Sequence, residues 1–344
     1  MPAAPPGADS DFTWRDAGRT IRFAPGLLAE PRAALGTLAE HGFEGFALFS
    51  TPRALAEHPR LADQAAAVHH VEPGQVPDAA AALLEEVGGA PILALGGGRV
   101  IDTAKAIAAV SGVEVAAAPT TMSGAEMTGI HRLPAGAGQR ARGLVRPSLV
   151  LADPLAMTSQ EEPALRASSI NALAHGADSL CTPLANPVSR MCALRGAGLI
   201  AAALDEERGS RGRAALALGS LLCGYAIDSA LFALHHVVCQ TLVRVCGSSH
   251  AETNAAVLPR TMAAMRSRAP EDMAGLAEAI GCSEEAIEER ILELGGDQEG
   301  LGAAGADASR LEEALDAIEA RPELAFTPDP PGRDELRAMI EAAW

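Results

Sequence analysis

The sequence predicts an α/β domain with a mostly parallel sheet, followed by an all-α domain. Between Phe12 and about Pro154, short β-prone runs alternate with helical runs rich in Ala and Leu, which is the rhythm of strands joined by crossover helices. Beyond Pro154 no strand pattern remains, and helical segments follow one another. A length of 344 residues fits two domains of ordinary size, and we expect them to span residues 1–156 and 157–344.

Each expected element lies between turn-forming residues. We expect strands within residues 20–26, 45–52, 67–74, 91–98, 114–121 and 149–154, and helices within 30–42, between 52 and 67, and within 78–89 and 99–112. The helical half is expected to break at Asn186-Pro187, at Cys246-Gly247 and in residues 295–305. The long apolar stretch 219–243 carries an Asp, two His and a Gln, so we expect one buried helix with a polar stripe rather than a membrane span.

Composition and charge exclude several classes of protein. With 48% hydrophobic and 21% charged residues, the chain can fold rather than remain disordered. The net charge of −17 argues against nucleic acid and against anionic membrane surfaces as partners. The six cysteines form no C-x-x-C pair, which indicates free thiols in a reducing compartment. Residues 1–12 lack the features of a signal peptide, and a cytoplasmic location is expected.

A run of three glycines follows the strand expected at 91–98 and opens a helix. Backbone N–H groups at such a turn can accept a phosphate, and glycine permits close approach and positive φ. Asp102 and Lys105 lie three residues apart on the first turns of the helix, where one face looks back over a bound phosphate. The alternative is an ordinary turn with a surface ion pair.

Hydroxyl side chains follow two further strands. Thr120 and Thr121 come at the end of one strand, the place where open α/β sheets bind ligands. Ser123 with Glu126 fits a capping box for a following helix. Ser50 and Thr51 end another strand without an acidic residue beside them, so both NAD and NADP stay possible as the dinucleotide.

Several histidines stand in the otherwise apolar second half. Asn171 and His175 are four residues apart on one helix face. His235 and His236 are adjacent, so they point about 100° apart around a helix. His250 follows Ser249, which with Glu252 again fits a capping box. A single histidine of this kind is commonly a core residue, but the group favours one shared polar pocket.

Taken together, these residues resemble the iron-containing alcohol dehydrogenase family, and most closely its maleylacetate reductase branch. The resemblance runs over roughly residues 12–282 and is carried by STP, GGGRVIDTAKAIA, PTTMSGAEMT, INALAHGADSLCTPLANP and LHHVVCQTLVRVCGSSHAETNAAVLP. It implies a dehydroquinate synthase-like fold, with a dinucleotide-binding α/β domain, a helical substrate and metal domain, an active site in the cleft between them, and homodimers.

The resemblance also implies which residues act. Cofactor binding falls to Ser50, Thr51, Pro52, Gly96, Gly97, Gly98, Arg99, Asp102, Lys105, Thr120, Thr121, Ser123 and Thr128, with the glycines, Asp102 and Lys105 at the phosphates and the three threonines at the nicotinamide. The catalytic set is His175, His235, His236 and His250, and the metal positions are Asn171, His175, His236 and His250.

At the metal positions the family's aspartate is replaced by Asn171. Losing the one anionic ligand weakens binding of a divalent ion such as Fe or Zn, so we expect an empty or weakly filled site. Three further positions depart from the family pattern. Gln240 stands in place of a histidine, Arg99 in place of a serine, and Met122 in place of the tyrosine of the reductase branch.

These observations predict an oxidoreductase that uses NADH or NADPH to reduce a small oxo-acid or enone. His236 or His250 is expected to donate a proton near neutral pH, and Arg99, Arg140, Arg142 or Arg146 to pair with a substrate carboxylate. Two alternatives stay open: a lyase or cyclase on the same fold that uses the dinucleotide without net redox, and a homologue that performs no chemistry.

Overall fold

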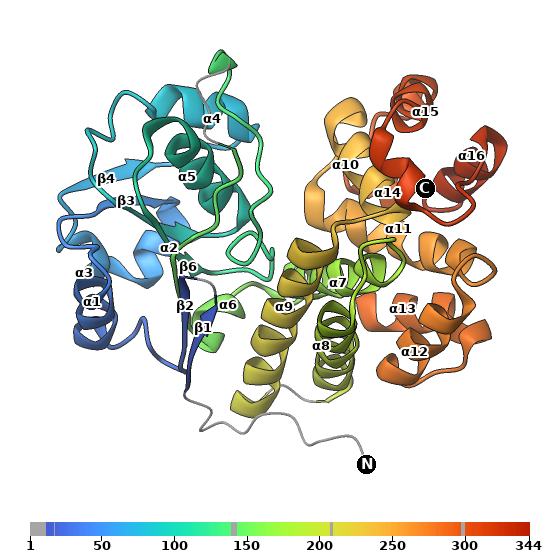
Figure 1. The fold of residues 1–344 in the computed structure, drawn as a ribbon, viewed down its shortest axis with the longest axis horizontal. Helices are drawn as coiled ribbons and strands as arrows, with labels where there is room; N and C mark the ends of the chain where they lie inside the picture. The colour runs from blue at the N-terminus through green and yellow to red at the C-terminus, as the bar shows by residue number, and fades with distance from the viewer. Residues whose placement is uncertain (1–11, 17, 139–142, 207–208, 297–299) are drawn as a thin grey trace. The chain divides into compact units, whose positions relative to one another are not determined.

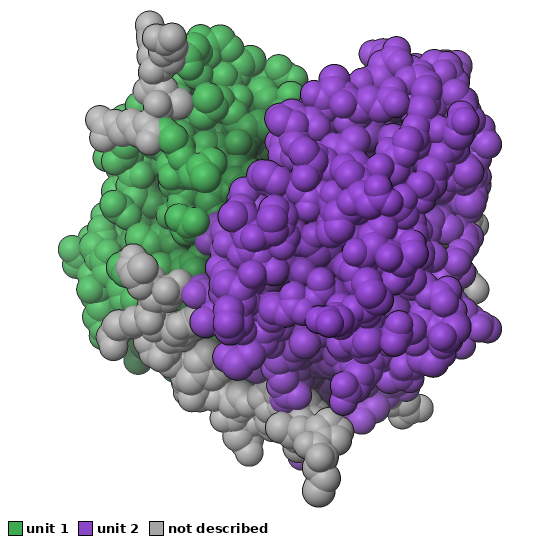
Figure 2. Space-filling model, turned by 45° about the vertical axis from the view of Figure 1, so that its right-hand side comes forward, with its two compact units in different colours: residues 1–160 green, residues 161–344 purple. Residues whose placement is uncertain are grey.

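The computed structural model describes residues 12–16, 18–138, 143–206, 209–296 and 300–344 (Figure 1). The chain forms two compact units, Met1–Gln160 and Glu161–Trp344, which Figure 2 shows in green and purple. The division lies four residues after the boundary expected at 156, because the short helix α6 (Pro154–Met157) continues the first unit.

The first unit is built on a sheet whose described strands run in the order β1-β2-β7-β6-β5-β3-β4. The strands are β1 (Phe12–Asp16), β2 (Arg19–Phe23), β3 (Ala47–Ser50), β4 (Ala67–His70), β5 (Ile92–Gly96), β6 (Val115–Pro119) and β7 (Leu149–Ala152). All neighbours pair in parallel except β1, which is antiparallel to β2. The mostly parallel sheet is confirmed, whereas the edge strand β1 was not predicted.

Helices cover both faces of this sheet. They are α1 (Pro31–Glu40), α2 (Pro52–Glu57), α3 (Pro59–Ala62), α4 (Val76–Leu83), α5 (Gly98–Ser111) and α6. Alternate strand residues point to opposite faces: Leu93 and Leu95 pack in a core with Leu38 of α1, whereas Ile92 and Ala94 pack in a core with Ile101 of α5. Strands buried on both sides read as continuous apolar runs, which is why they could be found from the sequence.

The parallel order brings three strand ends to one edge of the sheet. β5 lies between β3 and β6, with Leu95 paired to Ser50 and Gly96 paired to Pro119. The segments that follow these strands therefore start beside one another, at the carboxyl ends where such sheets bind ligands.

Every regular element described in the second unit is a helix, as expected. The helices are α7 (Glu162–Leu180), α8 (Pro187–Asp205), α9 (Ser210–Ala230), α10 (Leu234–Cys246), α11 (His250–Met265), α12 (Pro270–Ile280), η2 (Glu284–Ala286), α13 (Ile287–Gly295), α14 (Gly300–Ala303), η3 (Ala308–Arg310), α15 (Leu311–Glu319), η4 (Pro322–Phe326) and α16 (Arg333–Glu341). The break before α8 is confirmed, with Asn186 and Ser189 forming a capping box. Gly247 ends α10 in a left-handed conformation.

The apolar stretch 219–243 is two helices, so the prediction of a single helix was wrong. α9 ends at Ala230, and α10 starts at Leu234 after a bend of 98°. Within the described part of the chain no single helix meets the length and hydropathy of a membrane span, although this bent pair together does.

Candidate active site

β5 runs through a glycine turn directly into α5. Gly97 is the N-cap of α5, and it has no side chain to cap the first N–H groups of the helix. Gly97 and Gly98 are only half-buried, whereas Gly96 is buried. The start of α5 therefore presents backbone N–H groups and the positive end of a helix dipole, which together attract an anion.

These glycines are required by close packing. A Cβ on Gly97 would lie 3.0 Å from Thr121 Cγ2, and a Cβ on Gly98 would lie 2.9 Å from Ser123 Cβ. Positive φ is not the reason for these glycines, because Gly96, Gly97 and Gly98 are not among the glycines with positive φ. The turn is thus pressed against the segment that follows β6.

Lys105 forms the i,i+3 ion pair with Asp102 that was the alternative, but its side chain is fully buried rather than at the surface. Its Nζ donates to Asp102 Oδ1 at 2.8 Å and to the carbonyl oxygens of Ala125 and Ile130 at 3.1 and 2.7 Å. It also lies 3.4 Å from Thr128 Oγ1. The ammonium therefore holds the segment 121–130 against α5, and its role at a phosphate stays a prediction.

Ser50, Thr51 and Pro52 use their side chains within the fold. Ser50 is fully buried and donates to the carbonyl oxygen of Leu95 at 2.7 Å. Thr51 caps α2, whose first residue is Pro52, by accepting from the backbone N–H of Ala54. Both hydroxyl groups thus have partners within the fold, and their role in cofactor binding stays a prediction.

A cation that sequence reasoning missed stands next to them. Arg53 Nη2 donates to Thr120 Oγ1 at 3.2 Å, and Nη1 donates to Glu57 at 2.8 Å. Arg53 is half-exposed, so its guanidinium links the ends of β3 and β6 while still meeting solvent. The stretch STPR contained this signal, since an arginine after this strand end suits a nucleotide phosphate.

Ser123 and Glu126 do not cap a helix, since residues 121–130 form turns and bends. Ser123 Oγ instead accepts from the backbone N–H of Ala125 and lies 3.5 Å from Glu126 Oε2. Glu126 is fully buried, and no described group bonds its Oε1. Burial raises the pKa of Glu126 to about 7, so near neutral pH this carboxyl group exchanges a proton.

The arginines expected at a substrate carboxylate fall into two groups. Arg99 and Arg146 are exposed, while Arg140 and Arg142 lie outside the described residues. Met122, the replacement for a tyrosine, is fully buried and belongs to the core of the first unit.

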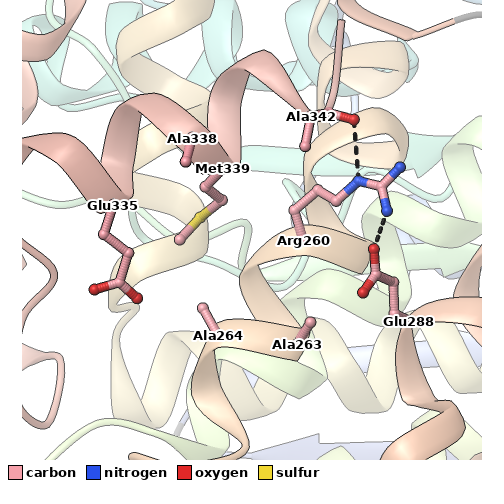
Figure 3. A pocket seen from close by; sticks show the side chains of 8 residues that line it. All are labelled: Arg260, Ala263, Ala264, Glu288, Glu335, Ala338, Met339 and Ala342. Atoms are coloured by element: carbon pink, nitrogen blue, oxygen red, sulfur yellow. Dashed lines mark hydrogen bonds and ion pairs between the residues drawn. The ribbon is translucent and has the colours of Figure 1, made fainter.

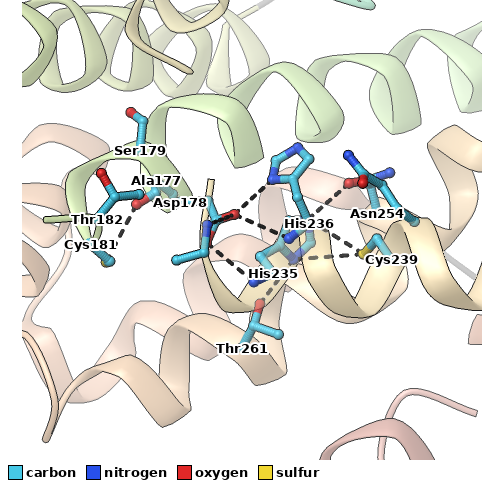
Figure 4. Close-up of polar contacts among 12 residues, drawn as sticks. Ala177, Asp178, Ser179, Cys181, Thr182, His235, His236, Cys239, Asn254 and Thr261 are labelled. Carbon is cyan, nitrogen blue, oxygen red and sulfur yellow. Dashed lines mark hydrogen bonds and ion pairs between the residues drawn. The ribbon is translucent and has the colours of Figure 1, made fainter. Parts of the chain in front are cut away.

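In the second unit, Asp178 of α7 caps the start of α10 (Figure 4). Its carboxylate accepts from the backbone N–H groups of Ala233, His235 and His236 at 3.0, 3.2 and 3.1 Å. Leu231, just before this cap, has a φ of +59°, a conformation that costs energy for a side chain of this size. The contacts of Asp178 fix where α10 begins, and with it the histidine pair.

The same carboxylate sets the tautomer of His236. Asp178 Oδ2 accepts from His236 Nδ1 at 2.9 Å (Figure 4), which leaves the ring's lone pair on Nε2. His236 Nε2 is buried and has no hydrogen-bond partner among the described residues. Burial, assisted by the charges of His250 and Arg321, lowers the pKa of His236 to about 3. This arrangement favours a neutral ring that accepts a hydrogen bond at Nε2, and proton donation by His236 stays a prediction.

His175 stacks on His236, with ring centroids 5.0 Å apart and planes inclined by 20°. Its Nδ1 is buried without a hydrogen-bond partner in the described part of the chain. Burial lowers the pKa of His175 well below its usual range. A neutral ring with no partner on Nδ1 can present either a proton or a lone pair there.

His235 points elsewhere and is fully occupied. Its Nδ1 lies 3.0 Å from Thr261 Oγ1, and its Nε2 lies 2.9 Å from Asn254 Oδ1. Asn254 Nδ2 donates to the backbone carbonyl of His250 at 2.7 Å, so its Oδ1 must accept from His235 Nε2. Both ring nitrogens of His235 are therefore engaged by neighbouring side chains.

His250 is exposed at the first residue of α11. Asn254 Nδ2 approaches His250 Nε2 at 3.5 Å, and this contact favours a ring with its proton on Nδ1. The expected capping box at this helix start is wrong, because Ser249 Oγ donates to the carbonyl of Ala304 instead.

Two sequence models of one family match the chain. The model described as "Fe-containing alcohol dehydrogenase family, C-terminal" covers residues 166–344, and "Iron-containing alcohol dehydrogenase" covers residues 56–154. The chain belongs to the iron-containing alcohol dehydrogenase family. It is therefore an NAD(P)H-dependent oxidoreductase, as predicted.

Individual relatives agree with this family. The chain is 32% identical to maleylacetate reductase 1 of Rhodococcus opacus over 287 residues, which are 81% of this chain and 79% of that protein. It resembles the crystal structure of a putative alcohol dehydrogenase from Ralstonia eutropha JMP134, with 29% identity and a TM-score of 0.84, and that of maleylacetate reductase from Agrobacterium tumefaciens, with 25% identity and a TM-score of 0.83. Each comparison covers 97% of this chain and 98% of the other.

The family name implies iron, but the residues described here do not fit it. They contain no group of three or more His, Cys, Asp or Glu side chains placed to hold a metal ion. The rings of His175 and His236 are nearly parallel, so their in-plane lone pairs do not converge on one point. Asn171 brings no charge, and the nearby carboxylate of Asp178 is used by α10 and His236. No catalytic step is derived through a metal.

A shallow pocket of about 230 Å³ elsewhere in the second unit is not a competing site (Figure 3). Its arginine, Arg260, is already paired with Glu288 and with the backbone carbonyl of Ala342. None of its lining residues is a histidine, and its two carboxylates, Glu288 and Glu335, are each paired with an arginine.

Sequence reasoning missed two residues of the histidine region. Asp178 carried a signal, since Asn171, His175 and Asp178 share a helix face at spacings of four and three. Arg321 carried none, because it precedes the short helix η4 far along the chain. Gln240, which replaces a histidine of the family pattern, accepts from Arg321 Nη1 at 3.0 Å.

Proposed function

We propose that this oxidoreductase reduces a small oxo-acid or enone with NAD(P)H, with maleylacetate as the first substrate to test. The observation that carries the proposal is the buried Asp178–His236 pair, which presents an unpartnered Nε2 beside the stacked ring of His175. The relatives named maleylacetate reductase support the choice of substrate.

We propose that the dinucleotide binds at the glycine turn of the first unit. The N–H groups at the start of α5 suit its pyrophosphate, and Thr121 and Ser123, which pack against Gly97 and Gly98, lie in reach of the same group. Arg53 suits the 2′-phosphate of NADPH, and no acidic residue stands at the end of β3 itself. The carboxylate of Glu57, at the end of α2, is paired with Arg53 Nη1. We therefore expect tighter binding of NADPH than of NADH.

Bound NAD(P)H supplies a hydride, which adds to the β-carbon of an enone or to the carbonyl carbon of an oxo-acid. The substrate oxygen then carries negative charge and one proton completes the reduction. His175 Nδ1 and His250 Nδ1 are the candidates to donate to that oxygen. His236 Nε2 accepts a hydrogen bond from a hydroxyl group of the substrate or product. In the reverse oxidation it would take the proton of that hydroxyl, with Asp178 stabilising the imidazolium.

Homodimer formation and a cytoplasmic location stay predictions, the first from the family and the second from composition.

Titration of the purified protein with NADH and NADPH, followed by product analysis with maleylacetate, tests this function. We expect one NAD(P)H to be consumed for each molecule reduced. Turnover without dinucleotide consumption would instead support the lyase or cyclase. Failure to bind either dinucleotide would overturn the proposal.

A further inference from the structure

Arg321 stands beside the histidine cluster without serving the proton chemistry. Its guanidinium carbon lies 5.6 Å from the ring centroid of Phe232, and that ring lies 5.8 Å from the ring of His236. The two distances together place the guanidinium carbon no more than 11.4 Å from the ring centroid of His236, a separation that a small substrate with a carboxylate at one end can span. The side chain of Arg321 is only 12% exposed.

The residues around Arg321 hold its guanidinium in one orientation. Nη1 donates to Gln240 Oε1 at 3.0 Å, Nε donates to Glu323 at 3.2 Å, and the guanidinium carbon lies over the ring of Phe232. Gln240 is four residues after His236 on α10, so both side chains lie on one helix face. The described residues accept from only two of the five N–H groups that an arginine carries.

Such a fixed and partly unsatisfied guanidinium is suited to a carboxylate, which it can bind through two parallel N–H groups. Gln240 contributes a neutral carbonyl acceptor. A glutamate at this position would neutralise Arg321, and a protonated histidine would repel it. The carboxylate of Glu323 neutralises part of the charge of Arg321. It contacts Nε, so Nη2 keeps no acceptor among the described residues.

We propose that Arg321, oriented by Gln240, Glu323 and Phe232, binds a carboxylate of the substrate and so selects oxo-acids over neutral ketones and enones. This inference rests on the proposed function, since it identifies the group that recognises the acidic end of the substrate. Gln240 then acts as a positioning residue.

The test separates carboxylate recognition from catalysis. Binding of succinate and of the neutral succinamide is measured by calorimetry for the wild type, Arg321→Gln, Arg321→Lys and Gln240→Glu, and kcat and KM are measured with maleylacetate. Arg260→Gln is the matched control, because Arg260 is also partly buried and holds one carboxylate and one backbone carbonyl. NADPH affinity reports that each variant is folded.

We expect wild type and Arg260→Gln to bind succinate in preference to succinamide. Arg321→Gln and Gln240→Glu should abolish that preference and raise KM for maleylacetate roughly 10- to 100-fold, with a smaller change in kcat. Arg321→Lys should be intermediate, since it keeps the charge and loses the fork.

Two results would overturn the proposal that Arg321 binds the substrate carboxylate. One is a wild type that binds succinate and succinamide equally well, and the other is an Arg321→Gln variant that still prefers succinate. If Arg321→Gln reduces maleylacetate with unchanged kcat and KM, the proposed function stands and the role of Arg321 in carboxylate binding is refuted. If succinate binding depends on Arg321 but the protein oxidises no NAD(P)H with maleylacetate, carboxylate binding by Arg321 is supported and the proposed function is refuted.

Discussion

At the scale of single residues, Asp178 has two tasks that its position explains. It supplies the acceptor that the start of α10 needs, and it holds the proton of His236 on Nδ1. An Asn side chain keeps the shape but must turn an N–H group toward other donors, which costs about 1–3 kcal/mol of stability. The substitution also removes the carboxylate that keeps the proton of His236 on Nδ1.

We expect Asp178→Asn to lower kcat about 10³-fold or more, as loss of a tautomer-fixing carboxylate does elsewhere. NADPH affinity should remain near wild type. Steady-state kinetics at a temperature where both proteins are folded measures the effect. Asp205→Asn, which removes a surface partner of Arg290, is the control. An Asp178→Asn enzyme with wild-type kcat would contradict the role of Asp178.

Glu126 is the second residue with a testable pH signature. Its pKa is about 7 in the fold against 4.5 for the free side chain, so folding favours its protonated form. The stability that this preference contributes is present below pH 4.5 and is lost as the pH rises through 7. The loss is roughly 3 kcal/mol.

Glu126→Gln is therefore expected to remove this loss, so that the variant exceeds wild type in stability above pH 7 and matches it near pH 4.5. Urea unfolding at a series of pH values, followed through a probe in the first unit, measures the difference. Parallel pH profiles for the two proteins would show that Glu126 titrates normally.

At the scale of elements, the two decisive features are a tight turn and a helix break. The glycine turn brings the start of α5 against the segment after β6, so that anion-binding N–H groups and hydroxyls stand together. The break between α9 and α10 gives α10 a new N-terminus, and Asp178 satisfies it while placing His236.

Gly98→Ala tests the turn, because its Cβ would come within 2.9 Å of Ser123 Cβ. We expect a stability loss of about 1–3 kcal/mol from overpacking and NADPH binding weakened by at least about tenfold, the equivalent of 1.4 kcal/mol. Gly36→Ala in α1 meets nothing within 4 Å and should instead stabilise by about 0.5–1 kcal/mol. Equal behaviour of the two variants in NADPH titration would contradict the close-packing account.

Elements set by local pattern were predictable, and those set by distant contacts were not. The parallel strands were recognisable in the sequence as continuous apolar runs, and Asn186 with Pro187 marks the start of α8. By contrast, nothing in the apolar stretch around Leu231 signals a break, since the cap comes from Asp178 on another helix. The capping box at Ser123 failed because the loop there is organised by Lys105 from α5.

The same division holds for the candidate site. Its residue types and helix spacings identified His175 and His236, but which nitrogen of His236 carries the proton depends on Asp178. His235 was expected to be catalytic because adjacency to His236 cannot reveal its bonds to Thr261 and Asn254. Ser50 is a strand-end hydroxyl whose partner, the carbonyl of Leu95, is supplied by the neighbouring strand.

At the scale of the whole molecule, we propose that the reaction uses the dinucleotide and side chains and needs no metal. Because the described histidines form no converging ligand set, we expect maleylacetate reduction to persist after exhaustive chelation and dialysis. Metal content by mass spectrometry and activity before and after EDTA treatment check this. Loss of activity on chelation, restored by Fe(II) or Zn(II), would show that a metal site assembles.

The most direct test of the central claim follows the hydride itself. NADPH labelled with deuterium at the transferable C4 position is incubated with the protein and maleylacetate, and the product is examined by mass spectrometry and NMR. The account predicts one deuterium in each product molecule, bound to carbon and matched by one NADP⁺ formed. A product without deuterium, formed while the labelled NADPH remains intact, would contradict it.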